Sequence, residues 1–246
     1  MKIHTISLAL LTTSQVYSQS IDIDYDFRSI LGRICDGSTS ATEVFAHYPS
    51  PASPNYSAAS ASFSAQDSYQ DFDGELQANG NAKLTSYLSN TGGHATGKVQ
   101  SLQTAPDQFN GGGFNSTYDF SFTLTEDITF CFHGSAQSEQ FVAHQEASPN
   151  SATSVSISLY HSGSGSLYNG FVNSNEFDPV GVVQTLNFDE SFDLLAGETY
   201  RFRVQASVGK HNGAESSFNV HFCVPEPSSA LMSLVGLAGF AFRRRR

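Results

Sequence analysis

Cysteine and histidine occur together at two places in the second half of the sequence. Cys131 lies two residues before His133, and His221 lies two residues before Cys223. Residues two apart on a strand point to the same face, so each pair would share one face. If the two strands were neighbours, four metal-ligand side chains would meet, and two cysteines with two histidines are a known zinc set. The same arrangement suits a disulfide, which an oxidising compartment favours, and unpaired thiols are a third alternative.

We take the disulfide between Cys131 and Cys223 as the leading hypothesis. It would fasten the last strand of the fold beside the C-terminal segment, and it would enclose a loop of about 92 residues, for which the chain-entropy model gives roughly 4 kcal/mol. Cys35 is the remaining cysteine. It has no partner in this scheme, so it is either free or joined to another chain.

Closely spaced carboxylates near the N-terminus resemble the start of a calcium-binding loop. The segment Asp22–Asp26 supplies the first three ligand positions, but Phe27 stands where the loop needs glycine and Arg33 where the bidentate glutamate belongs. The segment Asp71–Glu75 departs from the pattern in a similar way. An irregular calcium site stays an alternative, and we expect no other cofactor.

The known catalytic motifs are missing from the sequence. It contains no G-x-S-x-G elbow, no H-E-x-x-H helix and no glycine-rich phosphate loop. We therefore predict no catalytic residue and no enzyme. A secreted hydrolase is the least implausible enzyme class, and it would require two acidic groups facing each other across a cleft.

Two arginines and two tyrosines could contact a sugar. Arg201 and Arg203 share one strand face and could hold an anionic sugar, although such pairs are more often balanced by nearby carboxylates. Tyr160 and Tyr168 could stack on sugar rings, although most strand aromatics belong to the core.

The elements that would position these residues are strands. Apolar and polar residues alternate over residues 120–124, 155–159, 200–206 and 218–222, which is typical of half-buried antiparallel strands. Turn signals separate the strands, and they are Asp73-Gly74, Asn79-Gly80, Gly111-Gly112-Gly113, Ser162-Gly163-Ser164-Gly165, Ala196-Gly197 and Asn212-Gly213. The pattern predicts an all-β fold, an antiparallel β-sandwich or jelly roll. Residues 192–202 also loosely resemble the late hairpin of secreted bacterial β-sandwich modules such as the pre-peptidase C-terminal-like family, a resemblance that transfers no functional residue.

The composition limits the partners of the body. Charged residues make up 14 % of the chain, and no tryptophan is present. Without the basic and acidic residues of the two ends, the body has a formal charge of about −15. Because binding to nucleic acid or anionic lipid depends on lysine and arginine, we expect no nucleic-acid partner.

The N-terminus has the pattern of a secretory signal peptide. Lys2 precedes the apolar run Ile6–Leu11, and the small-residue pattern Val16–Ser18 predicts cleavage after Ser18. Residues 1–18 are thus the predicted signal peptide, with a buried first strand as the alternative. Such a peptide implies the general secretion machinery as a partner.

The C-terminus combines three features in a fixed order. Pro225, Glu226 and Pro227 hold the chain extended. Residues 228–242 are mostly apolar, and as a helix they would span about 22 Å, less than the roughly 30 Å of a hydrocarbon core. Four arginines end the chain: Arg243, Arg244, Arg245 and Arg246. Because positive charge stays cytoplasmic, the tail would insert in the inner membrane with the body outside, and its shortness favours transient insertion.

This tail resembles the PEP-CTERM sorting signal of exported bacterial proteins. The resemblance implies processing by exosortase, a membrane-embedded cysteine transpeptidase, near the Pro-Glu-Pro motif. It also implies a host that makes extracellular polysaccharide, and a mature protein at the cell surface or in the extracellular matrix after both end signals are removed.

The sequence therefore divides into residues 1–18, a β-sandwich body over residues 19–224 and a sorting tail over residues 225–246. Within the body we expect a looser first half (19–112) and a firmer second half (113–224). We expect a structural or adhesive protein, linked to extracellular polysaccharide; a carbohydrate-binding module is the alternative.

Overall fold

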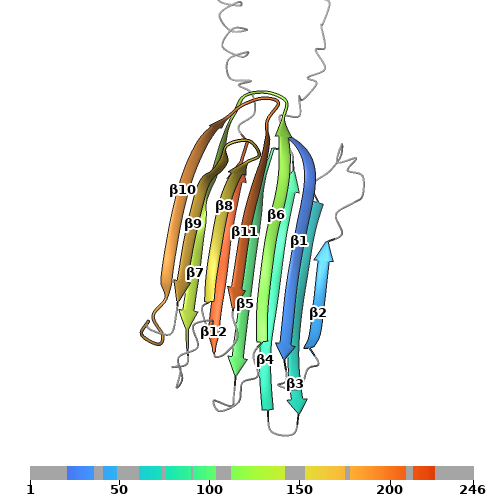
Figure 1. Cartoon of the computed structure of the whole chain (residues 1–246), viewed down its shortest axis with the longest axis vertical. Coiled ribbons are helices and arrows are strands. Elements are labelled where there is room, and N and C mark those ends of the chain that lie inside the picture. The colour runs from blue at the N-terminus through green and yellow to red at the C-terminus, as the bar shows by residue number, and fades with distance from the viewer. Residues whose placement is uncertain are drawn as a thin grey trace, which may run out of the picture.

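The computed structural model describes residues 21–35, 41–48, 61–73, 76–89, 91–103, 112–141, 153–174, 178–208 and 213–224. Figure 1 shows these residues as a set of long strands. The strands are β1 (Ile21–Cys35), β2 (Ala41–Tyr48), β3 (Ala61–Asp73), β4 (Leu76–Ser89), β5 (Gly92–Gln103), β6 (Gly112–Leu124), β7 (Ile128–Gln140), β8 (Thr153–His161), β9 (Gly165–Ser174), β10 (Gln184–Leu194), β11 (Thr199–Val208) and β12 (Ala214–Cys223).

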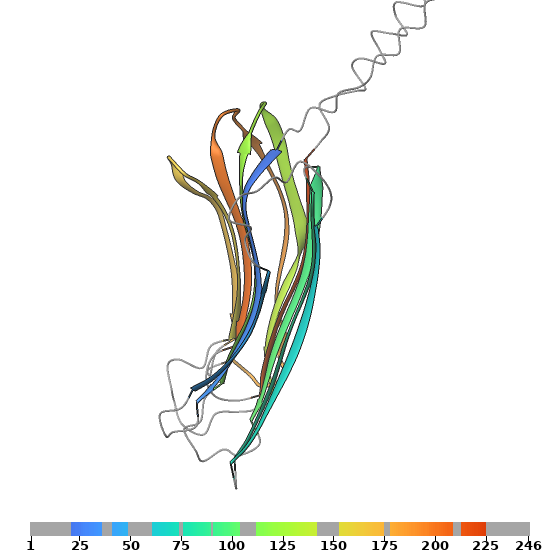
Figure 2. The same ribbon diagram turned by 90° about the vertical axis from the view of Figure 1, so that its right-hand side faces the viewer.

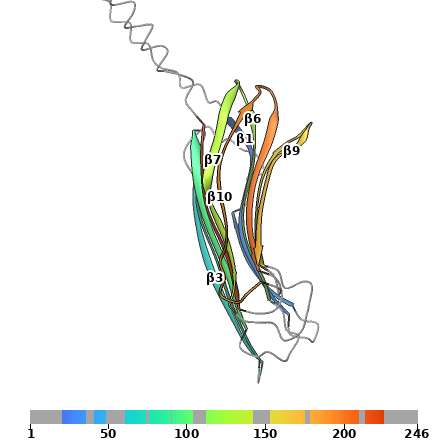
Figure 3. The same ribbon diagram turned by 90° about the vertical axis from the view of Figure 1, so that its left-hand side faces the viewer.

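The strands form two six-stranded antiparallel sheets. The first sheet has the order β2-β1-β6-β11-β8-β9, and the second has the order β10-β7-β12-β5-β4-β3. Figures 2 and 3 show the sheets face to face as two layers. The layers bend in the same direction, with the outer face of the first sheet on the inside of the bend. The predicted all-β antiparallel sandwich is confirmed.

Phenylalanine fills the space between the sheets. Phe120 and Phe122 of β6 and Phe202 of β11 point inward from the first sheet and are fully buried. Phe222 of β12 meets them from the second sheet, with its ring centroid 4.9 Å from that of Phe120. Phe132 of β7 lies 5.1 Å from Phe202 by the same measure. These spacings are those of attractive aromatic pairs, so the alternating pattern of the sequence becomes one continuous core.

Glycine has a packing role in the second sheet. Asn79-Gly80 was expected to be a turn, and this prediction is wrong, because both residues lie inside β4. A Cβ atom at Gly80 would lie 2.0 Å from the ring of Phe114, which packs across from the first sheet. A Cβ at Gly97 would lie 2.3 Å from the ring of Phe218. The glycines leave room for aromatic rings instead of reversing the chain.

Both sheets combine strands from the two halves of the body. β1 pairs with β6 in the first sheet, and β5 pairs with β12 in the second. The predicted boundary between residues 112 and 113 falls at the start of β6. The two halves are therefore joined by backbone hydrogen bonds in each layer.

A charged pair is buried inside the sandwich. Asp26 and Arg28 both point inward from β1 and have no exposed side-chain surface. Arg28 donates from Nε and Nη2 to the two carboxylate oxygens of Asp26, at 2.8 and 2.5 Å. Its Nη1 reaches Ser86 Oγ of the opposite sheet at 3.4 Å, and the guanidinium lies 5.7 Å from the ring centroid of Tyr118. Burial raises the pKa of the Asp26 carboxyl, and the hydrogen bonds from Arg28 oppose that rise.

Candidate functional site

The last strand of the body lies in the middle of the second sheet. β12 pairs with β7 on one side and with β5 on the other. Directly after it, the backbone N–H of Val224 donates to the carbonyl oxygen of Thr91 at 3.1 Å. The chain therefore enters its C-terminal segment from a strand that is hydrogen-bonded on both edges.

The predicted end signals lie outside the described residues. These are the signal peptide (residues 1–18), the sorting motif Pro225, Glu226 and Pro227, and the arginines Arg243 to Arg246. Within the described part of the chain, no helix is long and apolar enough to cross a membrane.

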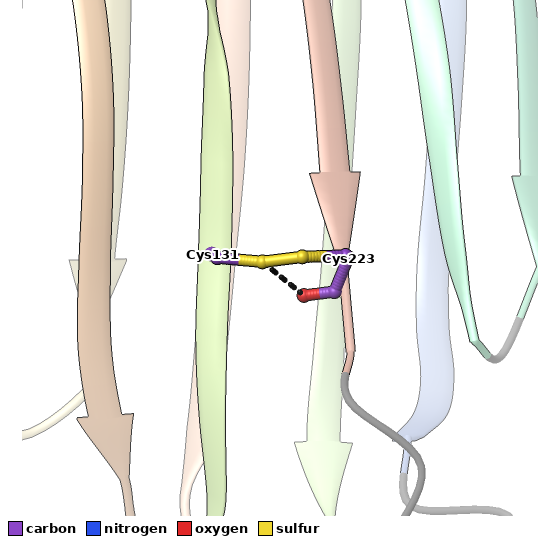
Figure 4. The surroundings of a disulfide bond; sticks show 2 residues. All are labelled: Cys131 and Cys223. Carbon is purple, nitrogen blue, oxygen red and sulfur yellow. Dashed lines mark hydrogen bonds between the residues drawn. A yellow bond between two sulfur atoms is a disulfide. The ribbon is translucent and has the colours of Figure 1, made fainter.

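Cys131 and Cys223 lie on neighbouring strands, as the disulfide hypothesis requires. They are directly opposite each other on β7 and β12, with Cα atoms 5.3 Å apart. In the structure their sulfur atoms are bonded, as Figure 4 shows. Sγ of Cys131 also lies 3.4 Å from the carbonyl oxygen of Cys223. Bonded sulfurs supply no thiolate, so this arrangement leaves no Cys₂His₂ set for zinc. Cys35 is the last residue of β1, opposite Ala41 of β2.

A row of aromatic side chains crosses the outer face of the second sheet next to the disulfide. His133 and His221 are directly opposite each other, and His94 of β5 is opposite His221 on the other side. The imidazole centroids are 5.5 Å apart for His133 and His221, and 5.7 Å apart for His221 and His94. Tyr87 of β4 continues the row, 5.7 Å from His94. Burial, together with the neighbouring imidazoles of His133 and His94, lowers the pKa of His221.

The acidic segment Asp22–Asp26 lies in a strand and not in a loop. Asp26 points into the core toward Arg28, while Asp24 sits at a register shift of β1 and accepts a hydrogen bond from Thr123 Oγ1 at 2.7 Å. The carboxylates thus diverge instead of surrounding one point. Among the described residues, no group of three or more histidine, cysteine, aspartate or glutamate side chains could hold a metal ion. The side chains of the second acidic segment, residues 71–75, lie outside the described part.

The two arginines of β11 share one carboxylate, so they are balanced by a nearby acidic side chain as such pairs usually are. Arg201 donates from Nε and Nη2 to Asp119 of β6 at 2.8 and 2.5 Å. Arg203 Nε lies 3.9 Å from the same carboxylate, and its Nη2 donates to Gln205 at 2.5 Å. The hydrogen bonds from Arg201 to Asp119 raise the pKa of the guanidinium. Two guanidinium groups therefore share one carboxylate on this part of the surface.

Aromatic side chains flank the arginines on the same outer face. Tyr160 of β8 is opposite Arg201 and is 48 % exposed. On the far side, Tyr25 and Phe27 of β1 stack with centroids 6.2 Å apart. Burial raises the pKa of Tyr25, and the negative charge of the Asp119 carboxylate adds to the rise. The second tyrosine singled out in the sequence, Tyr168, points inward instead, with its ring edge-on to Phe132 at 5.1 Å between centroids.

Sequence reasoning missed two of these groupings. The pair Asp26 and Arg28 is visible in the sequence only as two charged residues two apart, and the inward face of their strand could not be assigned because of the register shift after Ile23. His94 lies among glycine and threonine in a segment without clear alternation. Its place beside His221 depends on the strand order.

Comparisons with known proteins identify the tail and not the body. The model of the PEP-CTERM protein-sorting motif matches residues 224–246. No protein with a curated description matches the sequence.

Three solved structures show a distant likeness to the body. The K1 cleaved adhesin domain of Lys-gingipain from Porphyromonas gingivalis W83 is 10 % identical, with 68 % of this chain and 99 % of that chain covered and a TM-score of 0.26. An infectious bursal disease virus structure (Gt strain) is 9 % identical, with 85 % of this chain and 57 % of that chain covered and a TM-score of 0.29. The α-L-arabinofuranosidase MgGH51 is 8 % identical, with 53 % of this chain covered and a TM-score of 0.24. This chain spans about a fifth of the arabinofuranosidase, 22 %. Scores this low carry no argument about fold or function.

The tail is therefore the part of the chain that can be assigned. The matched segment begins at the residue that follows β12, so the described body ends where the motif starts. Residues 224–246 are a PEP-CTERM protein-sorting motif, and this chain is an exported protein of the kind that exosortase processes.

Proposed function

We propose that the body is a structural or adhesive component of an extracellular polysaccharide layer, at the cell surface or in the matrix, after both end signals are removed. The observation that carries the proposal is the attachment of the sorting motif to β12. This strand is central in its sheet, and Cys223 at its end is bonded to β7.

This attachment suits a protein that bears load. A pull on Val224 reaches Cys223 first and passes through the sulfur atoms to Cys131, so two strands share it. β12 also holds two ladders of backbone hydrogen bonds, one with β5 and one with β7. An edge strand would have one ladder and could be peeled away more easily. The proposed anchor point is thus a strand end held by two ladders and by the bond to Cys131.

The outer face of the second sheet supports the same role. One cross-strand row consists of small polar side chains, in the order Thr85, Thr96, Asn219, Ser135 and Asn187. Such a face presents many hydroxyl and amide groups, which can hydrogen-bond to sugar hydroxyls without a deep site.

The proposal is tested in the natural host by following the mature protein. Intact mass should place its ends near Gln19 and near Pro227, and the protein should co-fractionate with the polysaccharide layer. Deleting the gene should weaken that layer, and a chain lacking only residues 225–246 should be exported but lost from the layer. Recovery of Arg246 on the extracellular form, or an unchanged layer in the deletion strain, would count against the proposal.

A carbohydrate-binding module is the second candidate, and one observation favours it. Tyr160, Arg201 and Tyr25 lie in one cross-strand row on the outer face of the first sheet. Aromatic rings beside a guanidinium can stack on a sugar and hydrogen-bond to it.

This candidate predicts binding that depends on that face alone. Tyr160→Ala and Arg201→Ala should each weaken retention of the protein on extracellular polysaccharide of the host by about tenfold. Lys98→Ala is the matched control, because Lys98 is half exposed and ion-paired with Glu215 on the opposite face. Equal retention of all three variants would exclude a specific site on the first sheet.

A further inference from the structure

The three histidines on the outer face of the second sheet have no role in the proposed function. His94, His221 and His133 come from β5, β12 and β7, and all three are exposed. They lie in register across adjacent strands, with ring planes 28° apart for His94 and His221 and 12° apart for His221 and His133. Imidazole nitrogens are the ligands that zinc, nickel and copper ions accept readily.

The spacing of the rings suits a shared metal ion. A metal–nitrogen bond of about 2.0–2.1 Å places each imidazole centroid roughly 3.2 Å from the ion. Two imidazoles at a tetrahedral angle would then have centroids roughly 5.2 Å apart. The observed distance between His133 and His221 is 5.5 Å. In the structure the two rings are nearly parallel, at 12°, so each exposed side chain has to rotate before its nitrogen can reach a shared ion.

The ladder can offer two imidazoles to an ion but not three. His94 and His133 lie on opposite sides of His221, so their centroids are separated by about the sum of the 5.7 and 5.5 Å steps. That separation exceeds the roughly 6.4 Å that two imidazoles on opposite sides of one ion would reach. His94 therefore cannot join His133 and His221 at one ion, in keeping with the absence of any group of three potential ligand side chains among the described residues.

The neighbours of the row favour the pair His133 and His221 over the pair His221 and His94. The ring of His94 already stacks on Tyr87, at an interplanar angle of 16°. His133 instead has Asp189 of β10 as its register partner on the other side, so the neighbouring strand carries a carboxylate at this level of the sheet. Carboxylates next to metal-binding histidines orient the ring and strengthen its binding.

The disulfide fixes the relative position of the two strands that carry this pair. Cys131 and Cys223 lie two residues from His133 and His221, on the same face and in the same register. The strands cannot slide past each other while this bond is intact. The two imidazoles are therefore held opposite each other before any ion arrives.

We propose that His133 and His221 bind one divalent transition-metal ion, such as Zn²⁺ or Ni²⁺, on the outer face of the second sheet, with water completing the coordination.

The test is calorimetric titration of the untagged mature protein with ZnCl₂ and, separately, NiCl₂. The expected result is saturable binding of one ion per chain. His133→Phe and His221→Phe should each weaken binding by at least tenfold, because phenylalanine keeps the stacked row but has no nitrogen. His94→Phe is the matched control and should change the affinity by less than about threefold, because His94 is not a ligand of the proposed ion and phenylalanine can keep the ring contact with His221.

A second measurement uses Ni²⁺ as a paramagnetic probe in the folded protein. Amide resonances of β7 and β12 near His133 and His221 should broaden before those of β4 near Tyr87. Circular dichroism and the melting temperature of each variant establish that the fold is intact, and His221→Gln replaces any phenylalanine variant that fails this check. The proposal is overturned by unsaturable binding, by wild-type affinity of the His221 variants, or by equal losses in His94→Phe and His133→Phe.

Discussion

Replacing Asp26 with asparagine changes few atoms, but it should lower the stability of the fold strongly. The substitution keeps the shape of the side chain and removes its charge. Arg28 then keeps its charge inside the sandwich but loses the carboxylate that accepts two of its hydrogen bonds, and neither side chain has exposed surface. Ser86 reaches the guanidinium only at 3.4 Å and is neutral, so it cannot replace the carboxylate.

The size of the effect follows from the complete burial of the pair. Breaking a buried ion pair by removing one partner costs about 3 to 5 kcal/mol. For a chain of this length each kcal/mol lowers the melting temperature by roughly 2 to 4 °C. We therefore expect Asp26→Asn to melt about 6 to 20 °C below the wild type.

Urea unfolding of three variants separates the charge effect from a simple loss of contacts. Asp24→Asn is the matched control, since Asp24 is exposed on the same strand. This substitution should change the free energy of unfolding by less than about 1 kcal/mol. The double variant Asp26→Leu with Arg28→Met removes both charges and should recover most of the lost stability, because apolar replacements of buried pairs are often neutral or stabilising. The reasoning fails if Asp26→Asn lies within 1 kcal/mol of the wild type, or if the double variant is as unstable as the single one.

Three further predictions concern the second sheet. Replacing Cys131 and Cys223 with alanine should lower the free energy of unfolding by about 4 to 5 kcal/mol, from the 92-residue separation; equal urea midpoints for the two proteins would contradict the bond. Gly97→Ala should destabilise by about 1 to 3 kcal/mol, because the new Cβ meets the ring of Phe218, and an unchanged melting temperature would show that the ring moves aside freely. His221 should titrate below its ordinary pKa in an NMR pH series. Its neutral form is favoured by folding, so its stabilising contribution is present above about pH 6.5 and is lost as the pH falls through the lowered pKa; a normal or raised value would refute this.

The strands of the second half were predictable because period-two alternation is a local signal. Phe120, Phe122, Val155, Ile157 and Val204 all point to the core, as their spacing indicated. The cysteine face was predictable for the same reason, since Cys131 alternates with buried phenylalanines. The direction in which these side chains point could be predicted without knowing which strands are neighbours.

What depends on strand order was not predictable. That β12 lies between β5 and β7 is what places His94 beside His221, and no local pattern encodes that neighbourhood. Gly80 was misread because glycine serves turns and close packing alike, and only the ring of Phe114 across the core distinguishes them. Asp26 and Arg28 were missed because charged residues are expected outside unless a partner is known to be buried with them.

The central place of β12 also sets the order in which the sheets can be completed. The strands of the first sheet are all present once the chain has reached Val208, the end of β11. The second sheet at that moment is two pieces, β10-β7 and β5-β4-β3, with a gap between them. A chain ending at Val208 should therefore be digested rapidly at β5 and β7 in limited proteolysis, whereas one ending at Val224 resists.

In a chain delivered from its N-terminus, the strand that closes the gap is followed at once by the sorting motif. The second sheet is then completed only as the motif itself reaches the membrane. Cys131 can pair with Cys223 only after β12 has been delivered, so the disulfide cannot form before the last strand of the body is in place.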